Sequence, residues 1–258
     1  MAIPYFLDTY YDYDFIGGVT DVNTIITALN TQLVTTPPAA SKWTDTGGTG
    51  VGPFRSPADT NGNYFTITLA RVSATHLHFS MVDRYGLPVG ANVPIDIDGG
   101  GTDVNIYSGP YHLAVSSELA TPVAVWCGVL EQSPDPQGFP RPQWFMSVET
   151  NYYADRFYFK EIGASVYALQ TVGQTCLRCP DGSYEQYAVN GELKINPVEV
   201  IWGNYVYGRF YQAIYVDRGL DFADEVTVPI DTGVTGVFKI IGAKATGTPG
   251  VKLAYRIS

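Results

Sequence analysis

Residues 75–82 read THLHFSMV, a stretch in which polar and apolar side chains alternate. Leu77, Phe79 and Met81 fall on one face of an extended chain, and the two histidines and the serine fall on the other face. A period of two is the pattern of a β-strand with one buried face. The preceding run, YFTITLARV at residues 64–72, has the same character. We therefore expect consecutive strands in this part of the chain.

Similar strand-like runs continue to the end of the sequence, separated by turns such as RYG, DGGG and SGP. Such short intervals are typical of antiparallel sandwiches and barrels. The composition agrees, because charged residues make up only 16% while the chain holds 19 Tyr, 12 Phe, 27 Gly and 17 Pro. This balance favours strands and turns over helices. The later runs are VNIY, YHLAVS, VAVWCGVL, QWFMSVE, DRFYFKEI, SVYALQ, SYEQYAV, VEVIW, YVYGRFYQAIYV, EVTVPI, GVFKIIG and VKLAYRI.

One helix is expected, near the N-terminus. Its apolar positions follow the spacing of a single helical face. Asp21 or Thr20 is available as the N-cap, and the prolines of TPPAAS end the helix. Residues 44–63 are rich in Gly, Pro, Thr and Asp and predict a long loop. The apolar positions of the helix are Val22, Ile25, Ile26, Leu29 and Leu33.

A short pattern occurs twice in the chain. VDR at residues 82–84 is followed by VPID at 93–96, and VDR at 216–218 is followed by VPID at 228–231. Each VDR closes an apolar strand, and each VPID opens or forms the next extended segment. Duplication of a β unit explains the recurrence. Convergent hairpin chemistry is the alternative, because Asp-Arg suits a turn entry and Val-Pro suits the start of a strand.

A proline-rich segment supplies the expected boundary between two units. Residues 132–142, QSPDPQGFPRP, hold four prolines and a glycine, and proline cannot donate to a strand ladder. The expected fold is mainly β, with two related antiparallel β-sandwich-like units and one short N-terminal α-helix. Residues 1–138 would hold an N-terminal arm, the helix and the first unit, and residues 139–258 would form the second unit.

Charge and hydropathy exclude several classes of protein. With 25 acidic and 15 basic residues the formal net charge is −10, and no concentrated basic patch is present, so direct nucleic-acid binding is not expected. No apolar run approaches the roughly 20 residues of a membrane span, and the N-terminus lacks the features of a secretory signal. Three cysteines, an odd number, do not form a disulfide framework. We expect a soluble protein made in the cytoplasm.

Two histidines form the first candidate metal site. His76 and His78 project from one face of the expected strand, as a β-strand metal site requires, and His112 is available as a third ligand. A zinc site also needs second-shell carboxylates, and nothing in the sequence places one. A polar, solvent-facing side of the strand explains the alternation equally well.

Two further patterns offer metal ligands. Cys176 and Cys179 resemble half of a zinc knuckle, but Cys127 is the only other thiol, so a hairpin with ordinary thiols is the alternative. Carboxylates that flank a glycine loop could wrap calcium, although they lack the spacing of an EF-hand and also suit a plain turn. Those carboxylates are Asp96, Asp98 and Asp103.

No catalytic pattern is complete. Gly163-Ala-Ser-Val-Tyr167 lacks the second glycine of a nucleophile elbow, and Gly48-Thr-Gly-Val-Gly52 lacks the residues that follow a phosphate loop. Glu131, Glu149 and Glu161 could supply a glycosidase pair, but sequence does not give their separation. We therefore expect no enzymatic activity and no cofactor.

The segment YVYGRFYQAIYV, residues 205–216, is rich in aromatic side chains. Alternation places Tyr211 and Tyr215 on one face, and Gly208 suits a bulge between two registers. Exposed tyrosines suit sugar stacking or a subunit interface, because a flat ring buries a large area at a small cost in entropy. Packing in the core of a sandwich is the alternative.

The leader IPYFLDTYYDYDF, the Gly/Thr-rich strands and the ending VPIDTGVTGVFKIIG resemble virion structural proteins of tailed bacteriophages, especially tail, baseplate or neck components. This resemblance implies a non-enzymatic β-sandwich building block in the virion, synthesised in the host cytoplasm. Its partners would be copies of itself and other virion proteins. A carbohydrate-binding or receptor-binding module, with a glycan as partner, is the alternative, and a cell-wall glycan hydrolase is a third reading.

The leader and the aromatic segment are the expected contact regions. An arm such as Pro4 to Phe15 can add a strand to the open sheet edge of a neighbour. On that reading, deletion of Met1 to Gly18 leaves the fold intact and abolishes assembly. The expected partner-binding residues are Tyr5, Phe6, Tyr10, Tyr11, Tyr13, Phe15, Tyr211 and Tyr215.

Overall fold

The structure is a computed structural model of the chain. It confirms a mainly β fold with antiparallel sheets and a single short α-helix near the N-terminus. In several later strands only the backbone is described. The structure describes residues 11–59, 62–90, 92–119, 123–129, 143–148, 154–160, 167–169, 177–178, 195–202, 205–216, 224–231, 234–240 and 252–258.

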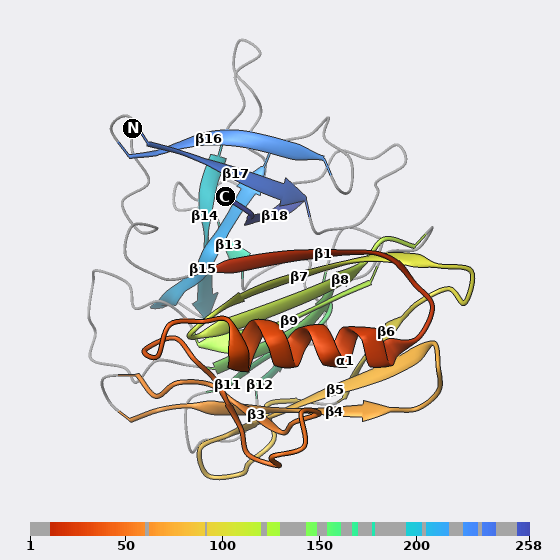
Figure 1. Cartoon of the computed structure of the whole chain (residues 1–258). Helices are drawn as coiled ribbons and strands as arrows, with labels where there is room; N and C mark the ends of the chain where they lie inside the picture. Colours follow the sequence, from red (N-terminus) through yellow and green to blue (C-terminus); the bar gives the residue numbers. More distant parts are fainter. Residues whose placement is uncertain are drawn as a thin grey trace.

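The strands form three antiparallel sheets that lie as successive layers (Figure 1). The N-terminal sheet has the order β2 (Thr44–Asp45), β3 (Phe54–Arg55), β4 (Phe65–Arg71), β5 (His76–Asp83) and β6 (Val93–Asp96). The central sheet has the order β1 (Asp12–Val19), β7 (Thr102–Gly109), β8 (His112–Ser117), β9 (Val123–Val129), β10 (Gln143–Val148), β11 (Ala154–Lys160) and β12 (Tyr167–Leu169). The C-terminal sheet has the order β13 (Leu177–Arg178), β14 (Ile195–Trp202), β15 (Tyr205–Val216), β18 (Lys252–Arg256), β17 (Val234–Ile240) and β16 (Glu225–Asp231).

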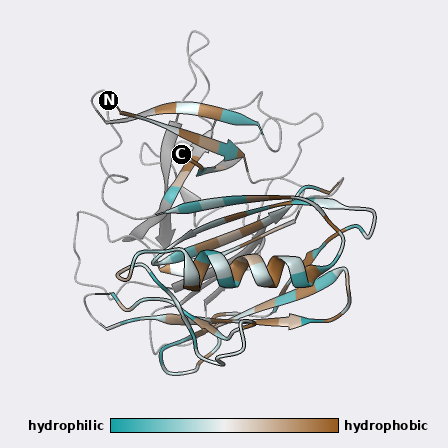
Figure 2. Ribbon diagram, viewed as in Figure 1, coloured by the Kyte–Doolittle hydropathy of each residue, from teal (hydrophilic) through white to brown (hydrophobic). Residues whose placement is uncertain are grey.

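The helix α1 (Val22–Asn30) begins where the sequence predicts. The Asp21 carboxylate accepts a hydrogen bond of 2.8 Å from the amide of Asn23, and a π-helical turn, η1 (Thr31–Thr35), follows before the prolines. All five predicted apolar positions are buried. They pack in the core between the central and N-terminal sheets, while the polar side of the helix stays outside (Figures 1 and 2).

Residues 44–63 are more ordered than a long loop. They contain the short strands β2 and β3, joined by a glycine-rich turn. The Asp45 carboxylate accepts hydrogen bonds from the amides of Gly47, Gly48 and Gly50 and so fixes that turn. The expectation of a loop holds for most of the described residues but missed these two strands, because strands of two residues are too short to show a period.

The central sheet is buried on both faces around β7, β8 and β9. On one face, valines, isoleucines and leucines pack against α1 and the N-terminal sheet in the main core. On the other face, Tyr107, His112 and Trp126 surround the ring of Tyr255 from β18. The distances from the Tyr255 ring centroid to these three ring centroids are 4.8, 5.3 and 5.8 Å. This aromatic cluster joins the central sheet to the C-terminal sheet.

The central sheet continues across the expected boundary at residues 138 and 139. Val129 of β9 pairs with Gln143 of β10, so strands from both expected units lie in one sheet. The chain changes from the central to the C-terminal sheet between Leu169 and Leu177. The proline-rich segment itself lies outside the described residues, and the division into two folding units stays a prediction.

The two copies of the VDR and VPID pattern lie in different arrangements of strands. In the first copy, β5 ends in Val82-Asp83 and pairs directly with β6, which is VPID. In the second copy, Val216 ends β15 and VPID ends β16, and β18 and β17 lie between these strands. The pattern does not mark a repeated pairing of strands, which agrees with the alternative of convergent turn chemistry.

Candidate functional site

The described part of the leader is a strand of the protein's own sheet. Residues 12–19 form β1, which pairs with β7 from Asp12 opposite Ser108 to Val19 opposite Thr102. This placement corrects the expectation of a free arm over these residues. In the order of described strands β1 lies at the end of the central sheet, so its other side is an edge. Tyr5, Phe6 and Tyr10 lie outside the described residues.

The side chains of β1 alternate between two environments. Tyr13 faces the C-terminal sheet, where its ring stacks on Tyr107 with centroids 5.1 Å apart. Phe15 lies on the same side but is 48% exposed, and its ring centroid is 5.2 Å from the Lys239 ammonium. Ile16 points the other way and packs against the main core. Just before the strand, the Tyr11 ring centroid is 4.4 Å from the Arg256 guanidinium carbon.

A polar network holds β1 against the layer behind it. The Tyr13 hydroxyl donates to the Asn105 side-chain oxygen at 2.8 Å, and the Lys239 ammonium donates to the same oxygen at 2.9 Å. The Asn105 amide in turn donates to a Glu118 carboxylate oxygen at 2.7 Å. Lys239 completes the network with an ion pair to Glu118 at 3.1 Å. Strands β1, β7 and β17 are therefore cross-linked by charge-assisted hydrogen bonds.

Electrostatics keep this network in one protonation state. Burial opposes the charge on Lys239, but the hydrogen bond to Glu118 and nearby charges outweigh it, so the pKa of Lys239 is raised. Burial also raises the pKa of the Tyr13 hydroxyl, against the opposing effect of Lys239. Lys239 therefore stays charged and Tyr13 stays neutral near pH 7.

We expect Lys239→Met to lower the free energy of unfolding by about 2–3 kcal/mol, because the Glu118 charge loses its counterion in a largely buried setting. Urea unfolding measures the effect. Adding Glu118→Gln removes the uncompensated charge, so the double variant should recover part of the loss. Equal stability of Lys239→Met and the wild type would contradict the importance of this network.

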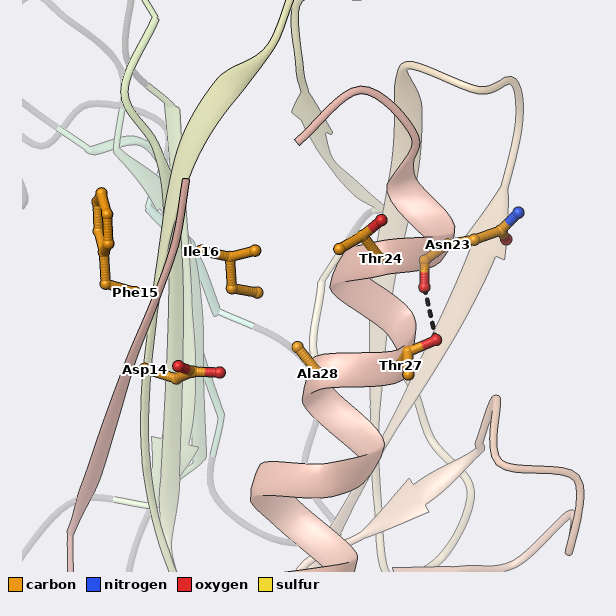
Figure 3. A pocket seen from close by; sticks show the side chains of 7 residues that line it. All are labelled: Asp14, Phe15, Ile16, Asn23, Thr24, Thr27 and Ala28. Carbon is orange, nitrogen blue, oxygen red and sulfur yellow. Dashed lines mark hydrogen bonds between the residues drawn. The ribbon is translucent and has the colours of Figure 1, made fainter. Parts of the chain in front are cut away.

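An open groove of about 580 Å³ lies between β1 and α1. Figure 3 shows that Asp14 and Ile16 of β1 face the helix across it, whereas Phe15 points to the opposite side of the strand. The helix side is polar: the Thr27 hydroxyl donates to the carbonyl of Asn23 at 2.9 Å. The groove is lined by Asp14, Phe15, Ile16, Asn23, Thr24, Thr27 and Ala28.

Acidic side chains line the edge strand. The Asp12 carboxylate accepts a hydrogen bond of 3.0 Å from the amide of Tyr13, which satisfies one backbone group within the chain. Asp14 is exposed. Charged residues on an edge strand limit indiscriminate pairing with other strands, so they restrict which partner can add to this edge.

The predicted histidine pair is brought together, but without His112. His76 and His78 lie on the same side of β5 with their Nε2 atoms 2.8 Å apart. The Nδ1 atom of His76 contacts the carboxylate of Asp96, its direct neighbour on β6. His112 lies on β8 of another sheet, fully buried beside Tyr255, where burial lowers the pKa of its imidazole to about 3. The prediction that His112 serves as a third ligand beside His76 and His78 was therefore wrong.

The contact between Asp96 and His76 was not predicted from the sequence. An antiparallel hairpin between the segments THLH and VPID would have placed this carboxylate opposite the histidine. The other carboxylates of the glycine loop have separate partners: Asp98 accepts from the amide of Gly100 at 3.0 Å, and Asp103 accepts from the amide of Gly18 at 2.9 Å. The loop carboxylates thus do not converge on one point.

The remaining predicted residues lie mostly beyond what the structure describes. Cys176, Cys179 and the three candidate glutamates are outside the described residues. Cys127 is buried, and burial raises the pKa of its thiol far above the ordinary range. Within the described ranges, no group of three or more His, Cys, Asp or Glu side chains is placed to hold a metal ion. No helix in these ranges is long and apolar enough to cross a membrane.

The aromatic strand β15 contains the predicted bulge. Val200 pairs with Gly208 and the next residue, Ile201, pairs with Val206, so the register shifts beside the glycine. A second irregularity accompanies Gln212, whose φ of 53° is rare for a residue with a side chain. It interrupts the alternation that assigned Tyr211 and Tyr215 to one face. The side chains of these two tyrosines lie outside the described residues.

Comparison with models of known protein families finds no match to this chain, and comparison with curated proteins finds none either. The edge strand β1, the groove beside it and the polar network behind it are the features of the molecule that bear on function.

Proposed function

We propose that the protein is a non-enzymatic structural component of a tailed-bacteriophage virion, of the tail, baseplate or neck type. It acts by association with copies of itself and with other virion proteins. The observation that carries this proposal is the position of β1: an edge strand with an exposed aromatic ring on one face and a groove on the other.

An edge strand is a suitable surface for such association. The backbone groups on its outer side are a template for an added strand, and the side chains of that strand alternate between the two faces. At β1 an added strand would meet the ring of Phe15 on one face and the groove beside α1 on the other. The acidic residues Asp12 and Asp14 favour a partner strand with basic side chains.

The polar network supports this role because it fixes the edge before a partner arrives. Tyr13 is held by stacking on Tyr107 and by the hydrogen bond to Asn105. A fixed edge loses little conformational entropy on association, which strengthens binding without additional contacts.

The same contacts change the expected result of deleting residues 1–18. That deletion removes Tyr13 from the network and Ile16 from the main core, so it should destabilise the fold rather than leave it intact. Single substitutions at exposed positions of β1 are therefore the cleaner test.

We expect Phe15→Ser to weaken self-association or incorporation into particles at least about tenfold, because exposed aromatic anchors often dominate interfaces. Asp14→Lys, which reverses a charge beside the groove, should weaken it as well. Sedimentation velocity and the yield of assembled particles measure the effect. Leu87→Ser is the matched control: Leu87 is 43% exposed, close to the 48% of Phe15, but lies in a turn away from β1.

Association unchanged in both Phe15→Ser and Asp14→Lys, with melting temperatures like that of the wild type, would contradict a contact through β1. The carbohydrate-binding alternative depends on Tyr211 and Tyr215, whose side chains are not described, so no observation in the structure favours it.

A further inference from the structure

The pair of histidines on β5 has a geometry that the proposed function does not use. Their Nε2 atoms are 2.8 Å apart, and their ring centroids are 4.7 Å apart at an interplanar angle of 68°. Both rings lie on the polar side of the strand, with the side chain of His76 30% exposed. The opposite side of the strand is the buried one, where Leu77 and Phe79 join the main core. The histidines are thus held in place but accessible from solvent.

The contact with Asp96 selects the tautomer of His76. The carboxylate accepts a hydrogen bond from Nδ1–H, so the Nε2 atom of neutral His76 carries a lone pair directed toward His78. Two ring nitrogens at 2.8 Å must share a proton, which His78 therefore supplies from its own Nε2. In the other neutral tautomer of His78 this proton sits on Nδ1, and a metal cation would then meet a lone pair from each Nε2 atom.

We propose that His76 and His78 bind one divalent transition-metal ion of the zinc, nickel or copper class through their Nε2 atoms. Asp96 acts as a positioning residue that orients His76, the arrangement in which a carboxylate supports a metal-bound histidine. Imidazole nitrogen suits these metals rather than magnesium or calcium. The described residues supply two protein ligands at this position, and water would complete the coordination shell.

The distances are compatible with this chemistry. Two nitrogens that bind tetrahedral zinc at about 2.0–2.1 Å lie ~3.3 Å apart, so the rings must separate slightly from their present contact. The exposed position of His76 permits that adjustment without movement of the backbone. The cross-strand pairing of His76 with Asp96 keeps the supporting carboxylate in place during it.

Isothermal titration of the untagged full-length chain with ZnCl₂ tests the proposal, with nickel as a second probe. We expect saturable binding of one ion that His76→Ala and His78→Ala each weaken at least about tenfold. Asp96→Asn should weaken it by about tenfold, as substitution of supporting carboxylates does at other metal sites. Ser80→Ala, on the same side of the same strand, is the control and should leave the affinity unchanged.

The imidazole nitrogens supply an independent readout. Zinc should shift the Nε2 resonances of two histidines in nitrogen-detected NMR spectra, and a third histidine, the buried His112, should not respond. Zinc binding retained at full strength in the His76→Ala/His78→Ala double variant would assign the ion to other residues and overturn the proposal. Absence of saturable binding to the wild type would overturn it equally.

Discussion

Replacing Tyr255 with alanine is expected to lower the free energy of unfolding by about 3–5 kcal/mol, the usual cost of removing a large aromatic side chain from a core. Tyr255 is fully buried and contacts the rings of Tyr107, His112 and Trp126. It comes from β18, whereas its neighbours come from β7, β8 and β9. Its loss leaves a cavity between two sheets rather than within one. Urea unfolding followed by tryptophan fluorescence gives the value.

Tyr255→Phe is the matched control for that substitution. The hydroxyl of Tyr255 is buried and has no hydrogen-bond partner among the described residues. Its removal should therefore change stability by less than about 1 kcal/mol, or even increase it. A loss below about 1 kcal/mol for the alanine variant would show that the two sheets do not depend on this cluster.

The second large effect is a loss of stability in acid that depends on His112. Burial lowers the pKa of this imidazole from its ordinary value of 6.5 to about 3 in the folded protein. Between these two values the unfolded chain binds a proton that the folded protein does not, so stability falls as the pH falls. The slope approaches about 1.4 kcal/mol for each pH unit, which amounts to roughly 3 kcal/mol between pH 6.5 and pH 4.

The variant His112→Leu isolates this contribution because leucine fills a similar space and does not titrate. The unfolding free energy of the wild type minus that of the variant should fall steadily, by roughly 3 kcal/mol, as the pH is lowered from 7 to 4. Parallel pH profiles for the two proteins would contradict a buried, neutral His112.

Local patterns in the sequence were sufficient for most elements of the fold. The alternation of THLHFSMV predicted β5 correctly, with its buried and polar sides, because one side of this strand faces water. The spacing of five apolar residues predicted α1 and its cap. The strand-like run SYEQYAV lies outside the described residues, so its assignment stays a prediction.

Contacts between layers could not be read from local patterns. The run YHLAVS alternates as if one side met solvent, yet every residue of β8 is buried. The covering layer includes Tyr255, which lies far along the chain from His112. Lys239 likewise resembles a solvent-facing residue within GVFKIIG, but it is only 8% exposed. Its burial is compensated by the ion pair with Glu118 and by the hydrogen bond that it donates to Asn105.

Long-range contacts of the candidate site could not be predicted from local patterns either. Alternating acidic and aromatic residues in the leader resembled a free arm, because nothing nearby in the sequence identifies β7 as its partner. Tyr13 and Asn105, which join the two strands, are 92 positions apart. The contact of Asp96 with His76 could have been predicted, because a hairpin between THLHFSMV and VPID places Asp96 opposite His76.

Immunogold electron microscopy of purified particles tests the central claim most directly. An antibody raised against the recombinant protein would be applied to particles from the source culture, with a blot of the same particles to verify its specificity. A structural component predicts label confined to the tail, baseplate or neck. Particles that carry neither label nor a band on the blot would contradict a role in the virion.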